Sequence, residues 1–141
     1  MARWLVRLGL SAENAPEPES SSDPNLREKL FNSMSRLETE RMVAIFADAR
    51  GRMISQELVA EGDRGQVRLS LRKIFTKALN RDARRMIIAH NHPSGCADPS
   101  EGDIVSTQRL NEYARTLGIV LEDHLIIGHE RITSMRRSGF F

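Results

Sequence analysis

Residues 86–93 have the sequence MIIAHNHP, in which an apolar run changes abruptly to polar residues. The apolar run is typical of a buried strand, and Pro93 and Gly95 predict where that strand stops. In a strand, residues two apart project from the same face, so His90 and His92 can converge on one ion. The alternative is a pair of polar residues that merely ends a strand, because short histidine motifs often occur by chance.

A second polar signal follows His92 after seven intervening residues, where Ser100-x-x-Asp103 precedes a helix-like stretch. This spacing predicts a capping box, with Ser100 as the N-cap and Asp103 at the third helical position. A capping role still allows the Asp103 carboxylate to point at a metal held by the preceding strand. Two histidines and one carboxylate, with a fourth position open for water, form the ligand set of a catalytic zinc site. Structural zinc sites commonly use several cysteines, and this chain has only Cys96.

Hydrolysis at such a site also needs a base that takes a proton from water. Glu40 is the candidate, because it stands just before the apolar run MVAIFA at residues 42–47. The alternative reading is an exposed glutamate at the end of a helix.

The rest of the chain alternates between helical and strand-like patterns. Asp23-Pro24 predicts the start of a helix that runs to about residue 37, and Ser70 and Ser100 predict two further N-caps. Strands are expected at residues 42–47, 53–60, 86–92, 119–121, 125–127 and 131–135, with the polar triplet 122–124 separating two of them. This alternation predicts an α/β sandwich with a mixed sheet. Residues 1–23, rich in Pro, Glu and Ser, are expected to form a flexible N-terminal segment, and residues 24–141 one domain.

The residues quoted above, taken as a set, resemble the JAMM (MPN+) metalloisopeptidase motif. The string HNHPSGCADPSEGD at residues 90–103 is similar to the bacterial RadC-type branch of that family, and the similarity continues through LEDHLIIG at 121–128 and through 134–140. It covers about residues 37–141. The resemblance implies a JAMM-type sandwich, with a mixed sheet flanked by helices in a layout related to that of the cytidine deaminases.

The resemblance also implies the roles of individual residues. It makes His90, His92 and Asp103 the ligands of one zinc ion per chain, Glu40 the catalytic base and Ser100 a donor to the oxyanion. The implied activity is that of a zinc-dependent peptidase or isopeptidase, with a peptide or an isopeptide-linked protein as its substrate. His124 matches a histidine of the RadC-type branch and is expected to be hydrogen-bonded near the sheet edge, with a role behind the metal or at the substrate as the alternative.

Two rival functions from other classes stay open on the sequence alone. One rival is a RadC-type module of DNA repair or metabolism with little or no peptidase activity, and another is an interaction domain whose zinc is structural. The net charge is only +2, and residues 1–36 do not resemble the helix-hairpin-helix region that precedes this domain in full-length family members, so weak or no binding to nucleic acid is expected. No run of 18 apolar residues is present, so no membrane association and a cytoplasmic location are expected, while the oligomeric state stays open.

Overall fold

The structure is a computed structural model that describes residues 23–62 and 70–141. In chain order these residues form α2 (Pro24–Met34), β1 (Glu40–Ala47), β2 (Met53–Gly62), α3 (Leu71–Asn80), β3 (Arg85–Asn91), α4 (Glu101–Thr116), β4 (Val120–Ile127) and β5 (Ile132–Ser134). Apart from Asp23, the expected N-terminal segment lies outside the described residues. None of the helices described is both long and apolar enough to cross a bilayer.

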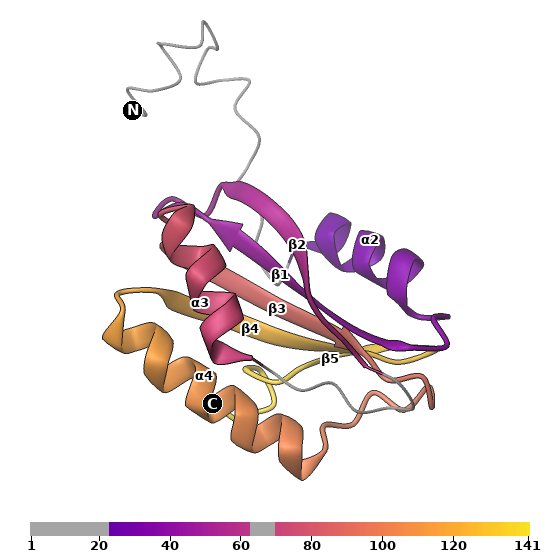
Figure 1. Ribbon diagram of the computed structural model, residues 1–141. Coiled ribbons are helices and arrows are strands. Elements are labelled where there is room, and N and C mark those ends of the chain that lie inside the picture. Colours follow the sequence, from indigo (N-terminus) through magenta and orange to yellow (C-terminus); the bar gives the residue numbers. More distant parts are fainter. Residues whose placement is uncertain (1–22, 63–69) are drawn as a thin grey trace, which may run out of the picture.

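The five strands form one mixed sheet in the order β2-β1-β3-β4-β5 (Figure 1), which confirms the predicted α/β class. β1 runs antiparallel to β2 and β3, and β5 antiparallel to β4, whereas β3 and β4 are parallel. Parallel neighbours need a crossover connection, and α4 supplies it. The carboxyl end of β3 therefore lies close to the start of α4.

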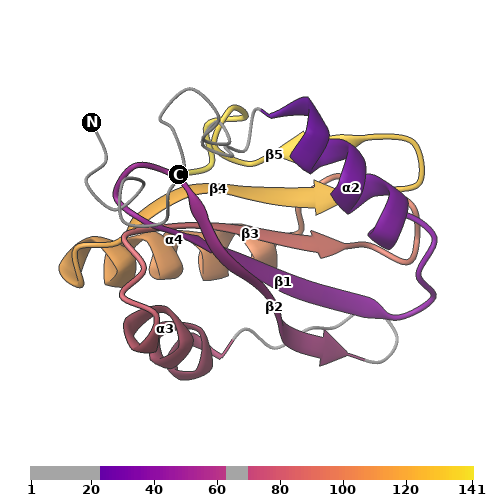
Figure 2. The same cartoon turned by 90° about the horizontal axis from the view of Figure 1, so that it is seen from above.

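Helices cover both faces of the sheet, as Figures 1 and 2 show. Successive side chains of a strand point to opposite faces, so each central strand contributes to two cores. The core under α2 contains Leu26, Leu30, Met34, Ile45, Ile87, Ala89, Leu125 and Ile127. The core on the other face joins α3 and α4 to the sheet through Ile74, Phe75, Ala78, Leu110 and Ala114 packed on Met42, Ala44, Phe46, Met86, Ile88 and Leu121.

The helix starts agree with the predicted caps. The Asp23 side chain accepts a hydrogen bond from the Asn25 N–H at 2.8 Å, with Pro24 in the first turn, and Ser70 caps α3. Ser100 and Asp103 form the predicted capping box at the start of α4. The first helix ends at Met34 and so is shorter than predicted.

The prediction of two short strands separated by residues 122–124 was wrong, because β4 is continuous from Val120 to Ile127. Burying polar side chains is unfavourable unless they find hydrogen-bond partners, and these residues have them. Asp123 accepts hydrogen bonds from the Ser134 hydroxyl and from the backbone N–H of Arg136, and Glu122 pairs with Arg85. Those partners are distant in sequence, so the polar triplet does not interrupt the strand.

Candidate metal centre

Four of the predicted side chains meet at the carboxyl end of β3. The Nε2 atom of His90 lies 3.0 Å from Nε2 of His92, 3.3 Å from Oδ1 of Asp103 and 3.6 Å from Oε1 of Glu40. The Nε2 atom of His92 lies 3.1 Å from Oδ2 of Asp103. The structure therefore brings together residues from β1, from the end of β3 and from the first turn of α4.

Strand register explains why Glu40 reaches His90. Met42 of β1 pairs with His90 of β3, and Glu40 precedes Met42 by two residues on the same face of the sheet. Glu40 is the first residue of β1 and is only 4% exposed. The alternative of an exposed glutamate at a helix end is therefore wrong.

His92 lies just beyond the end of β3, but its backbone continues the pairing of β3 with β4. Its N–H donates to the Ile127 carbonyl of the neighbouring strand β4 at 3.0 Å. Its ring Nδ1 lies 2.8 Å from the carbonyl oxygen of Cys96. A carbonyl can only accept, so Nδ1 carries the proton and the neutral ring turns the lone pair of Nε2 towards His90 and Asp103.

The chemistry of these donor atoms fits a cation. Glu40, His90 and His92 each offer one ligand atom, and the three atoms lie within 4.8 Å of one another, so the cluster could hold a metal ion. The two carboxylate oxygens of Asp103 add further acceptors beside both imidazoles. Lone pairs that converge at these distances repel one another unless a positive charge lies between them.

The surroundings of the site favour that positive charge. Burial by itself raises the pKa of the Asp103 carboxyl, but the adjacent imidazoles of His90 and His92, which donate to it when protonated, outweigh burial and hold that pKa well below the ordinary value. The hydrogen bond that protonated His92 would make with Asp103 raises the pKa of His92. The side chains of His92 and Asp103 are each 17% exposed, whereas that of His90 is 1% exposed. Solvent therefore reaches the site from the side of His92 and Asp103.

Ser100 takes part in the site through the capping box. Its hydroxyl oxygen accepts the Asp103 N–H at 3.0 Å, while Oδ2 of Asp103 accepts the Ser100 N–H at 2.9 Å. The cap holds the Asp103 carboxylate beside the imidazoles and uses the Ser100 hydroxyl only as an acceptor. Ser100 is exposed, so its side chain lies where the site meets solvent.

Asn91, between the two histidines, has a role that the sequence analysis missed. Its Oδ1 accepts the Arg41 N–H at 2.7 Å, and its Nδ2 donates to the Thr39 carbonyl at 2.9 Å. These two bonds hold the backbone on either side of Glu40 against the end of β3. The only sequence signal was its place inside the motif, because its partners lie about 50 residues earlier.

His124 and Cys96 also lie near the centre. His124 is 1% exposed in β4 and is hydrogen-bonded, as expected, and burial lowers its pKa well below the ordinary value. Cys96 is exposed, and its thiol lies 3.4 Å from Oδ2 of Asp98. Cys96 approaches the centre through its carbonyl group, which holds the His92 ring.

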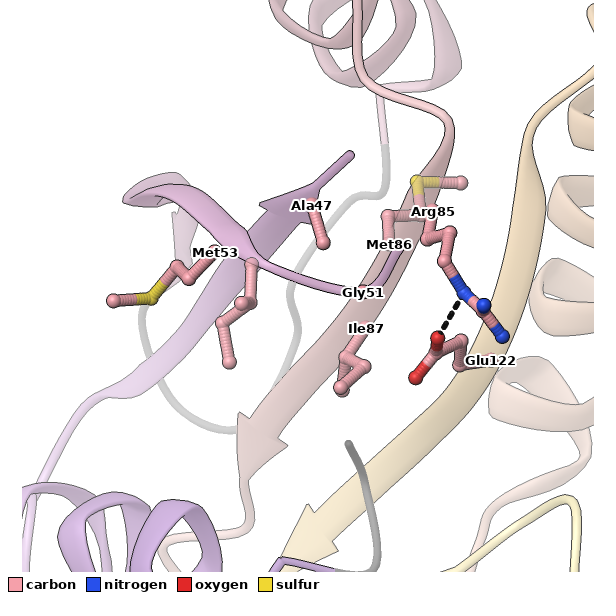
Figure 3. Close-up of a pocket in the computed structure, with 8 residues that line it drawn as sticks. Ala47, Gly51, Met53, Arg85, Met86, Ile87 and Glu122 are labelled. Atoms are coloured by element: carbon pink, nitrogen blue, oxygen red, sulfur yellow. Dashed lines mark ion pairs between the residues drawn. The ribbon is translucent and has the colours of Figure 1, made fainter. Parts of the chain in front are cut away.

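A small hollow occurs at the opposite end of β3 (Figure 3). Ile45, Met86 and Ile87 are among the residues that line it, and Arg85 and Glu122 form an ion pair beside it. Of the residues of β3 that line the hollow, Ile87 is the nearest to His90, and it precedes His90 by three residues, about 10 Å at ~3.3 Å per residue. The hollow is therefore separate from the candidate metal centre.

Replacing Gly128 with alanine should destabilise the loop that carries Cys96. A methyl group there would overlap the carbonyl oxygen of Gly95 and come within 3.0 Å of the Ala97 Cβ. Overpacking of this kind typically lowers the free energy of unfolding by about 1–3 kcal/mol, which chemical denaturation would measure. Gly102→Ala is the control, because its added Cβ would meet only the Ser100 hydroxyl, at 3.7 Å. Equal stability of the two variants would show that the loop yields without cost.

The chain is similar to known proteins over most of its length. Residues 20–140 match the family model described as RadC-like JAB domain. The chain is similar to a UPF0758 protein of Finegoldia magna, with 34% identity over 94% of this chain and 60% of that protein. It is also similar to UPF0758 proteins of Rhodobacter capsulatus, with 37% identity over 86% of this chain and 57% of that protein, and of Enterococcus faecalis, with 33% identity over 86% and 52%. The chain thus spans between half and two thirds of the length of these curated relatives.

Proposed function

This chain belongs to the family of RadC-like JAB domains, and on that premise we propose that it is a zinc-dependent hydrolase of amide bonds. Its proposed substrate is a peptide or an isopeptide-linked protein. One observation carries the proposal: two imidazole nitrogens and two carboxylates converge at the end of a buried strand, with an opening to solvent on one side. A hydrolase of this type needs both a metal site and access for a substrate.

His90, His92 and Asp103 are the proposed zinc ligands. Zinc prefers nitrogen and oxygen donors of this kind, and three protein ligands leave a fourth position for water or substrate. Asp103 is favoured over Glu40 as the carboxylate ligand because it lies close to both imidazoles, whereas Glu40 lies 3.6 Å from His90. A zinc ion bound there would supply Lewis-acid activation of water and of the scissile carbonyl group.

Glu40 and Ser100 are the proposed catalytic residues. The buried Glu40 carboxylate accepts a proton from the attacking water and then donates it to the leaving nitrogen as the carbon–nitrogen bond breaks. The Ser100 hydroxyl accepts only the Asp103 N–H within the cap, so its own proton can be donated to the oxyanion that forms on the substrate. The hydrogen bonds from the Asn91 side chain to the backbone of Thr39 and Arg41 hold Glu40 in place for both proton transfers.

We propose weak or no binding to nucleic acid for this domain. The net charge of +2 offers little general attraction for phosphate. Two of the cations on α3 and its end, Lys77 and Arg81, are moreover already paired with Glu57. The rival role in DNA metabolism would need a binding surface of another kind.

The proposal is tested by metal analysis together with a cleavage screen. Purified protein is analysed for zinc and then offered libraries of peptides and of lysine-linked isopeptides, with and without a chelator. We expect bound zinc and a cleavage activity that the chelator removes and added zinc restores. Cleavage that survives complete removal of the metal would contradict the proposal. Bound zinc without cleavage, together with a DNA complex stable at ~200 mM salt, would favour the rival role instead.

A further inference from the structure

We infer that Thr107 and His124 set the tautomer of His90, so that its Nε2 lone pair faces the metal centre before a metal ion arrives. The inference deepens the proposed function, because it rests on the zinc site proposed there. It assigns a positioning role to two residues that would not touch the metal. The three side chains come from α4, β4 and β3, and only the folded chain brings them into line.

The direction of the chain of hydrogen bonds is set at Thr107. Its hydroxyl oxygen lies 2.6 Å from the backbone carbonyl oxygen of Asp103. Two oxygens at this distance need a proton between them, and the carbonyl has none, so the hydroxyl donates. The Met135 sulfur, at 3.6 Å, is a second acceptor for the same proton. In either case the hydroxyl has no proton left for His124.

The same reasoning then fixes both rings. The Thr107 hydroxyl oxygen lies 2.7 Å from Nδ1 of His124, so that nitrogen must carry the proton. A neutral imidazole has one ring proton, which leaves a lone pair on Nε2 of His124. That Nε2 lies 2.6 Å from Nδ1 of His90, so Nδ1 of His90 donates and its Nε2 keeps the lone pair that faces Asp103, His92 and Glu40.

Burial makes this arrangement hard to reverse. Thr107 and His90 are 0% exposed and His124 is 1% exposed, so there is no open surface at which solvent could replace a lost partner. The opposite tautomer of His124 would place two lone pairs together at Thr107, and at His90 it would either bring two N–H groups together or force His90 to move its proton to Nε2, on the side of the metal centre. A buried polar group without a partner is strongly unfavourable, because it has lost its hydrogen bonds with water and gained none in return.

The two histidine ligands are therefore oriented by different means. The Cys96 carbonyl holds the ring of His92 at an exposed loop, whereas a buried side-chain relay holds the ring of His90. Partners behind metal ligands fix tautomer and ring orientation, and their loss typically lowers metal affinity by about 10–100-fold. A defect in the relay should therefore appear as weaker zinc binding.

The matched variants are Thr107→Val and Thr107→Ser. Valine keeps the shape of threonine but removes the hydroxyl, so His124 loses the acceptor that fixes its tautomer, whereas serine keeps the hydroxyl. We expect zinc affinity to fall by about 10–100-fold in Thr107→Val and to stay within a few fold of the wild type in Thr107→Ser, as measured by competition with a chromogenic chelator. Ring nitrogen NMR of the metal-free protein, at a pH where the rings are neutral, should show His90 protonated at Nδ1 in the wild type and partly at Nε2 in Thr107→Val.

A second pair of variants tests whether Thr107 acts through His124. His124→Phe keeps a ring but removes both nitrogens, so adding Thr107→Val to it should lower zinc affinity no further. Thermal unfolding of each variant shows whether the fold is retained. Unchanged zinc affinity and an unchanged His90 tautomer in Thr107→Val would overturn the inference, as would equal losses in the valine and serine variants. If the wild type binds no zinc but the NMR shift occurs, the relay stands and the proposed function fails.

Discussion

Glu40→Gln is expected to lower the rate of amide hydrolysis by about 10²–10⁴-fold while zinc stays bound, the range typical for loss of a general base. Glutamine has nearly the same shape but cannot take a proton from water. The glutamine side chain should keep the position of the glutamate, because Asn91 still holds the backbone of residues 39–41 against the end of β3. The rate with the best substrate of the cleavage screen and the zinc content would both be measured.

Glu38→Gln is the matched control for this prediction. Glu38 is an exposed glutamate two residues earlier in the chain, so the same change of charge there should leave the rate unaltered. If Glu40→Gln loses zinc as well as activity, Glu40 is a ligand, which the cluster of Glu40, His90 and His92 permits. If it cleaves at the wild-type rate, another group is the base.

Asp103→Asn is expected to weaken zinc binding by more than the ~10–100-fold that is typical when a partner behind a ligand is lost. The carboxylate has oxygens 3.3 Å from His90 and 3.1 Å from His92, and it carries the negative charge nearest to both rings. Asparagine is neutral and would turn an amide N–H₂ towards one of these nitrogens. Isothermal titration of the metal-free protein with zinc would measure the loss.

Ser100→Ala separates the ligand role of Asp103 from its capping role. Both residues belong to the capping box, so a defect that comes only from the helix start would appear in either variant. Loss of the cap should lower the free energy of unfolding by about 1 kcal/mol and leave zinc bound. Loss of the proposed oxyanion donor should raise the activation barrier by about 3 kcal/mol. Equal zinc affinity in Asp103→Asn and the wild type would falsify the proposed ligand set.

The side chains of the candidate metal centre come from several structural elements. β3 carries His90 at its buried end, the loop after it carries His92, and the cap of α4 carries Asp103. Each candidate ligand is held by a different partner: His90 by Thr107 and His124, His92 by the Cys96 carbonyl, and Asp103 by the Ser100 N–H. Such outer partners orient the ligands of a metal site before the metal binds.

Sequence reasoning predicted most of the helices and strands correctly, and the structure places the side chains of the candidate ligands near one another. The apolar run before His90 and the caps at Asp23, Ser70 and Ser100 are local signals, because neighbouring residues decide strand burial and helix starts. The same reasoning failed at residues 122–124. Polar residues normally end a strand, and nothing local indicates that Ser134, Arg136 and His90 will satisfy them.

What the sequence determined by itself is the α/β alternation, the spacing of His90, His92 and Asp103, and the resemblance that marked Glu40. Only the tertiary structure decided that Glu40 is buried beside His90, that Asn91 holds the chain around it, and that Thr107 and His124 stand behind His90. The physical reason is the sequence separation over which each kind of interaction acts. Periodicity and capping act over a few residues, whereas the hydrogen bonds made by Thr107, His124 and Asn91 join residues between 17 and 52 positions apart, and these residues meet only through strand pairing and the packing of α4 on the sheet.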